Sequence, residues 1–179
     1  MNKKIALLGL STFACVLSMS SCTSVGEHKA SSELYYTNFT QADSEEYNFL
    51  RTVYQLASDE VEFAKIISQK GSSANVKSLA ANLTNQYSGV LTKISELAKN
   101  ADVLIPFPAA SKFELTGGLD SAQSGVLEKE FLKHSLHNQE RIIHQFESVE
   151  RNTKVATNRY ASEILPALEK TAEETKALL

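Results

Sequence analysis

The sequence predicts an all-α protein whose folded domain is an antiparallel four-helix bundle. Apolar residues recur at steps of three and four in four long stretches, which is the period of an amphipathic helix. Short polar connections separate the first stretch from the second and the third from the fourth, so these neighbours should run antiparallel. A longer loop separates the second stretch from the third, and no alternating apolar stretch predicts a strand.

The first two helices have clear boundaries. Asp43 is the expected N-cap of the first helix, with Glu46 completing a capping-box pattern, and Gly71 should follow its end. The second helix should begin after Ser72 or Ser73 and end near position 100. The inward stripes are Tyr47, Leu50, Tyr54, Ala57, Val61 and Ala64, then Val76, Leu79, Leu83, Tyr87, Val90, Ile94 and Leu97. Tyr54 and Tyr87 are expected in the core, with partners for their hydroxyls.

The second half of the chain begins with the predicted loop. Residues 101–118 contain Pro106 and Pro108, which disfavour a helix there. The third helix should begin near Asp120 or Ser121 and run to about position 151. The fourth should cover 154–179, with a kink at Pro166.

The N-terminus resembles a bacterial lipoprotein signal. Lys3 and Lys4 precede an apolar stretch over 5–17, and small residues then lead to Cys22. In such signals the cysteine is acylated with fatty acids such as palmitate, and the peptide before it is removed. The expected domains are a signal peptide (1–21), a lipidated flexible tether (22–42) and the bundle (43–179). An ordinary secretory signal with a chance cysteine is the alternative.

The cysteines and the net charge limit the location and the partners to be expected. Cys15 would leave with the signal, so the mature chain would hold only Cys22 and no internal disulfide. Thr23, where an inner-membrane retention signal would have Asp, favours the outer membrane, with the domain facing the periplasm or cell surface. Loss of Lys3 and Lys4 leaves 16 basic and 21 acidic residues, a net charge of −5. This acidic balance argues against nucleic acid as a partner.

Metal binding is the first chemistry to consider in a helical bundle. No Glu-x-x-His pair, the spacing of a di-iron bundle site, occurs in the sequence. Glu130, His134 and His137 are the candidate metal ligands, because they recur at helical spacing. Glu60 or Glu62, or Glu163 and Glu169, could complete such a site. The competing interpretation is an ordinary solvent-exposed helix face, so we expect no metal or other cofactor.

Enzymatic catalysis has no support in the sequence. The mature chain would lack a free thiol, and no serine lies in a Gly-x-Ser-x-Gly turn. The paired Gly117 and Gly118 are too isolated to form a phosphate-binding loop. We therefore expect no enzyme.

Several short motifs together resemble the domain of unknown function 4142 family, over about positions 47–178. They are Asp59-Glu60-Val61-Glu62, Val76-Lys77-Ser78-Leu79-Ala80, Leu97-Ala98 with Ile105-Pro106, Glu130-Phe131-Leu132, Ile142-Ile143-His144-Gln145-Phe146 and Leu165-Pro166-Ala167-Leu168. The resemblance implies an exported, ferritin-like bundle, often of the outer membrane. Family members carry Asp-His at Gln86-Tyr87, and histidines at Gln139 and near Thr171, whereas Glu60 keeps the family's acidic residue. If those histidines bind metal, this chain lacks most of the set.

These observations predict a non-enzymatic, membrane-anchored bacterial lipoprotein. Lipidated Cys22 would attach it to the membrane, and the bundle would meet a protein partner that the sequence does not identify, in an envelope or stress-related role. Transition-metal binding or storage in the bundle is the alternative function.

Overall fold

The computed structural model describes residues 40–107, 112–115, 117–151 and 154–179. Its elements are α2 (Ser44–Lys70), α3 (Ala74–Asn100), the short 3₁₀ helix η1 (Leu119–Ser121), α4 (Ser124–Glu150) and α5 (Val155–Lys176). These described ranges contain helices and no strand, and the helices pack against one another. The prediction of an all-α four-helix bundle is therefore confirmed.

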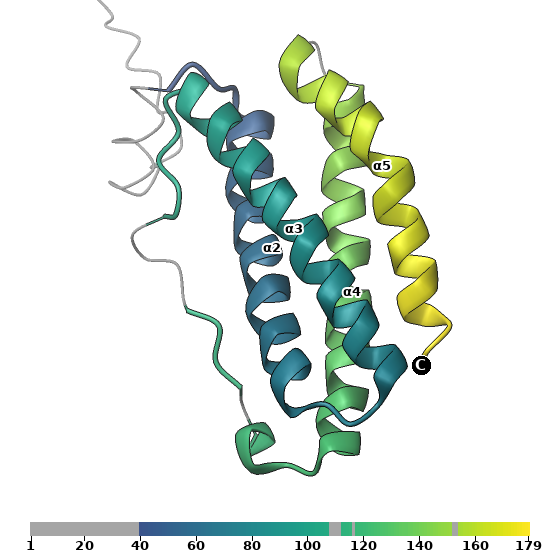
Figure 1. The fold of residues 1–179 in the computed structure, drawn as a ribbon. Coiled ribbons are helices and arrows are strands. Elements are labelled where there is room, and N and C mark those ends of the chain that lie inside the picture. The colour runs from purple at the N-terminus through teal and green to yellow at the C-terminus, as the bar shows by residue number, and fades with distance from the viewer. Residues whose placement is uncertain (1–39, 108–111, 116, 152–153) are drawn as a thin grey trace, which may run out of the picture.

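The long connection between α3 and α4 determines the topology. Helices α3 and α4 run in one direction and α2 and α5 in the other, and the described residues of this connection lie along the outside of the bundle (Figure 1). Helix α2 packs extensively on α3 and α4, and α5 packs mainly on α4. The contact between α3 and α5 is much looser. Each packed pair of neighbours is antiparallel, and one crossover connection replaces a short turn.

The starts of α2 and α3 are as predicted. The Asp43 carboxylate accepts a hydrogen bond from the Glu46 backbone N–H at 2.8 Å, and the Ser73 hydroxyl accepts one from Val76 at 3.5 Å. Glu46 does not complete the capping box with its own side chain. Its buried carboxylate accepts a hydrogen bond from the Thr157 hydroxyl on α5 at 2.5 Å. It thus joins the first turns of two helices.

The predicted start of the third helix is wrong by about one turn. Asp120 and Ser121 lie in η1, and α4 begins only at Ser124. Gly118 precedes η1 with a φ of 76°, and its carbonyl accepts a hydrogen bond from the Ser121 N–H. Glycine adopts this left-handed conformation without steric cost. It turns the chain toward the bundle before α4 begins. In α5, the helix continues through Pro166.

A carboxylate from α4 caps the start of α3. Glu128 is buried, and its Oε1 accepts hydrogen bonds from the backbone N–H groups of Ser72 at 2.5 Å and Ser73 at 2.7 Å. Ser73 is the N-cap of α3, so its N–H has no acceptor within the helix, and Ser72 is the residue before it. The negative charge also lies at the positive end of the helix dipole. A side chain from another helix therefore completes the capping of α3.

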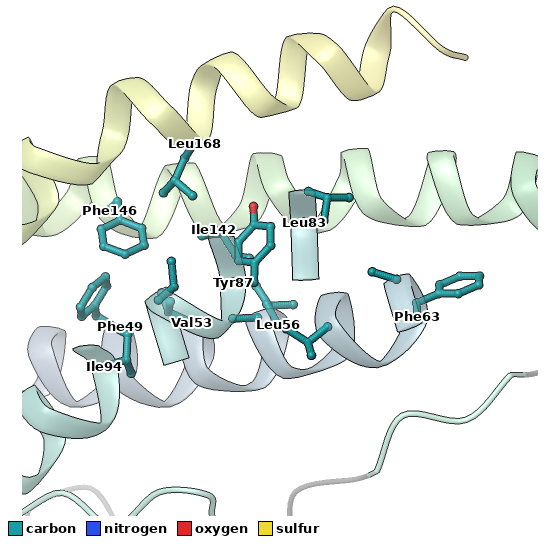
Figure 2. Close-up of a cluster of buried hydrophobic side chains, with 14 of the residues drawn as sticks. Phe49, Val53, Leu56, Phe63, Leu83, Tyr87, Ile94, Ile142, Phe146 and Leu168 are labelled. Carbon is teal, nitrogen blue, oxygen red and sulfur yellow. The ribbon is translucent and has the colours of Figure 1, made fainter. Parts of the chain in front are cut away.

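The core follows the predicted stripes. Phe49 meets Phe146 edge to face with ring centroids 5.1 Å apart, and Phe63 meets Phe131 in the same way at 5.2 Å. Figure 2 shows the rings of Phe49, Phe146 and Phe63 with aliphatic side chains between the helices. Tyr54, predicted inside, is only partly buried.

The first described residues are bound to the end of α3. Thr40 Oγ1 donates to the Ala101 carbonyl oxygen at 2.6 Å, and the Gln41 N–H donates to the same oxygen at 2.9 Å. Lys154 Nζ donates to the Gln41 carbonyl at 3.1 Å. The predicted signal peptide, Cys22 and most of the predicted tether lie outside the described residues.

Candidate functional site

A buried polar cluster interrupts the apolar core. It consists of Glu60 on α2, Tyr87 on α3, and Ser135, Asn138 and Gln139 on α4. Glu60 lies three residues after Ala57 and four before Ala64, which places it on the core-facing side of α2. Gln139 lies three residues before the buried Ile142 and occupies the equivalent face of α4. Helical spacing therefore places these polar side chains inside the bundle.

Glu60 is the centre of this cluster and is fully buried. Ser135 Oγ donates a hydrogen bond to Glu60 Oε2 at 2.7 Å. Burial raises the pKa of Glu60 to about 7, although hydrogen bonds from Ser135 and Asn138 oppose the rise. The nearby charge of Asp59 raises the pKa further. Glu60 is thus a carboxyl group that exchanges its proton near neutral pH.

Tyr87 contradicts the expectation for its hydroxyl. The side chain is fully buried, as predicted, but among the described residues its hydroxyl has no hydrogen-bond partner. Burial and the charge of Glu60 raise the pKa of Tyr87 well above its usual value. The tyrosine is therefore a neutral donor within electrostatic reach of Glu60.

Gln139 adds two more polar atoms without partners. Its Oε1 and Nε2 are both buried, and neither finds a partner in the described part of the chain. The same holds for Glu60 Oε1. Each such atom costs about 1–3 kcal/mol of stability. For four atoms the total is comparable with the net stability of a typical domain, about 5–15 kcal/mol.

His134 connects the cluster to the edge of the bundle. Asn138 Nδ2 lies 2.9 Å from His134 Nε2, and Asn138 also hydrogen-bonds to Glu60. The imidazole contacts Phe63 and, from the crossover loop, Phe113, with ring centroids 5.5 and 5.8 Å away. Burial therefore lowers the pKa of His134, and the charge of Asp59 partly offsets this.

The structure does not assemble the three candidate ligands of α4 into a metal site. Glu130 forms a salt bridge with Lys133 at 2.8 Å, His134 faces Asn138, and His137 is exposed. Throughout the described ranges, no group of three or more His, Cys, Asp or Glu side chains is placed to hold a metal ion.

Of the four carboxylates that could complete a metal site, only the one on Glu60 points inward. Glu62 pairs with Lys65 on the surface at 2.8 Å, and Glu163 and Glu169 are exposed. Glu60 alone reaches the interior, where it meets Tyr87, Ser135 and Asn138 instead of the histidines. The sequence carried a signal for this cluster, since polar residues stand at core-facing positions of three apolar stripes.

A comparison with protein-family models matches residues 36–178 to a domain of unknown function, DUF4142. The chain belongs to the DUF4142 family. Curated proteins and solved structures gave no match. The DUF4142 match covers every described helix, so the family assignment applies to the whole bundle.

Two of the positions at which this DUF4142 member departs from the family resemblance lie at the buried cluster, whereas Gln86 and Thr171 do not. Tyr87 and Gln139 stand where the resemblance expects histidines, and both are buried with Glu60 between the helices. The donor set present does not suit a transition metal, which prefers imidazole, thiolate or several carboxylates. Glu60 supplies one carboxylate and Gln139 one amide oxygen, and the five residues of the cluster include no imidazole and no thiolate.

The described helices do not include a membrane span. None of them combines the length and the apolar character that crossing a bilayer requires.

Proposed function

We propose that this DUF4142 protein is a lipid-anchored protein of the bacterial cell envelope, with a non-enzymatic interaction role. The observation that carries the proposal is the signal-like N-terminus ending at Cys22. Acyl chains on Cys22 would contribute about 0.8 kcal/mol per buried CH₂, so several chains would hold the protein on the membrane. The absence of Asp at Thr23 favours the outer membrane.

The bundle supports the interaction part of the proposal. It has a continuous apolar core, and its exposed faces carry ion pairs such as Lys93 with Glu96 at 2.8 Å. The first bundle helix starts at Ser44, so about twenty residues would separate it from the lipid anchor. A linker of this length would let the bundle reach a protein partner near the membrane surface. We do not extend the proposal to a transition-metal centre, because the buried donor set does not favour one.

The test is to replace the cysteines one at a time. Cys22→Ala should abolish labelling by radioactive palmitate and move the protein from the membrane fraction to the soluble fraction. Cys15→Ala is the matched control, because that cysteine lies within the apolar signal stretch, and it should leave labelling and fractionation unchanged. Continued labelling and membrane association of Cys22→Ala would disprove the anchor.

A further inference from the structure

Six buried side-chain polar atoms lack partners among the described residues, and four of them belong to fully buried side chains. These four are Glu60 Oε1, the Tyr87 hydroxyl oxygen, and both side-chain polar atoms of Gln139. The three side chains are fully buried and come from three different helices. Interiors of folded proteins rarely leave such groups unsatisfied, and ordered water is a frequent partner where protein atoms are not.

The three side chains occupy one region of the interior. The hydrogen bond from Ser135 to Glu60 fixes α4 beside α2, and Gln139 lies one helical turn beyond Ser135 on the same face. Figure 2 shows the Tyr87 hydroxyl pointing toward α4, near Ile142. Ile142 is three residues after Gln139, so the Tyr87 hydroxyl points toward the stretch of α4 that carries Gln139. The charge of Glu60 also raises the pKa of Tyr87, which agrees with these two side chains lying near each other.

The chemistry of these atoms distinguishes between possible occupants. The Tyr87 hydroxyl and Gln139 Nε2 donate hydrogen bonds, whereas Glu60 Oε1 and Gln139 Oε1 accept them when Glu60 is ionised. A cation would interact only with the acceptor atoms and would leave the hydrogens of the Tyr87 hydroxyl and the Gln139 amide without acceptors. A water molecule both donates and accepts, and buried waters typically make about three hydrogen bonds. The mixed set therefore matches water.

We propose that Glu60, Tyr87 and Gln139 form an internal water-binding site that connects α2, α3 and α4. One water accepts hydrogen bonds from the Tyr87 hydroxyl and Gln139 Nε2 and donates one to Glu60 Oε1. Its second hydrogen, or a second water, reaches Gln139 Oε1. Hydrogen bonds to this water, instead of direct contacts between the three side chains, connect the three helices.

Beside Tyr87 in the chain, α3 and α5 form only a loose seam. A surface groove at that seam is lined by Gln86, Val90, Tyr160 and Ile164, among others. Gln86 is next to Tyr87 in the chain, and its Nε2 donates to the Ala167 carbonyl across the seam at 3.0 Å. The side chain of Gln86 thus lines the groove and joins α3 to α5.

The test counts long-lived internal waters in the purified full chain by ¹⁷O magnetic relaxation dispersion. The main variant combines Tyr87→Phe with Gln139→Leu, which keeps the side-chain shapes and removes three of the four polar atoms. We expect this variant to lose at least one long-lived water relative to the unmodified chain. Thr175→Val is the control, because the buried Thr175 hydroxyl already donates to the Thr171 carbonyl within its own helix, and the water count should not change.

Two results would overturn the proposal. The first is an unchanged dispersion in the double variant, with folding confirmed by circular dichroism. The second is a stoichiometric metal found by elemental mass spectrometry in the unmodified chain and lost in Glu60→Gln. If the double variant does not fold, Tyr87→Phe alone decides the question. It should lower the dispersion amplitude or shorten the residence time of the water, and an unchanged profile would again refute the site.

Discussion

Replacing Glu60 by Gln should remove a large part of the pH dependence of stability. The folded protein keeps the Glu60 proton up to about pH 7, whereas the unfolded chain releases it near the ordinary value of 4.5. The contribution of Glu60 to the free energy of unfolding is therefore highest below pH 4.5, falls as the pH rises toward 7, and then levels off. At about 1.36 kcal/mol for each pH unit of that interval, the loss is about 3 kcal/mol.

The assay is urea unfolding followed by circular dichroism at several pH values between 4.5 and 7.5. The pH-dependent loss of stability should be smaller in Glu60→Gln than in the unmodified protein by about 3 kcal/mol. Asp59 and His134 have pKa values that also differ from their usual values, but they are present in both proteins, so the comparison isolates Glu60. Glu62→Gln, an exposed carboxylate on the same helix, is the control and should behave like the unmodified protein. Equal pH dependence in Glu60→Gln and the unmodified protein would refute the reasoning.

Two further predictions concern carboxylates that join helices. Glu128→Ala removes the acceptor for the Ser72 and Ser73 N–H groups, so the free energy of unfolding at pH 7 should fall by about 1–2 kcal/mol. A loss below a few tenths of a kcal/mol in urea titrations would show that water replaces the cap. Thr157→Val leaves the buried Glu46 carboxylate without its 2.5 Å donor, and thermal unfolding should show a loss of about 1–3 kcal/mol. An unchanged melting temperature in Thr157→Val would contradict a structural role for that bond.

Much of the fold is predictable from the sequence because helices have local signals. The caps at Asp43 and Ser73 and the apolar period depend on residues three or four positions apart, which the sequence displays directly. The start of α4 was misplaced because no side chain caps it. The left-handed Gly118 and the turn at η1 precede the helix and determine where it begins. Both belong to the crossover loop.

The candidate site was only partly predictable. Spacing on one helix suggested Glu130, His134 and His137, but the orientation of each depends on neighbours from other helices and from the crossover loop. Phe113, distant in sequence, covers His134 from that loop. The burial of Glu60 follows from its place in the α2 stripe, whereas its contact with Ser135 requires the packing of α2 on α4. Such contacts join residues far apart in the chain, and one sequence does not reveal them.

The bonds at the start of the described chain give the bundle a mechanical property. Thr40 and Gln41 are held by the carbonyl of Ala101, 61 residues away from Thr40, and Gln41 is held in turn by Lys154. A pull on the N-terminal segment therefore loads the ends of α2, α3 and α5 together. These hydrogen bonds would have to break before the pull reaches the rest of α2. A force applied through the N-terminal segment therefore acts first on the hydrogen bonds that join the ends of these three helices.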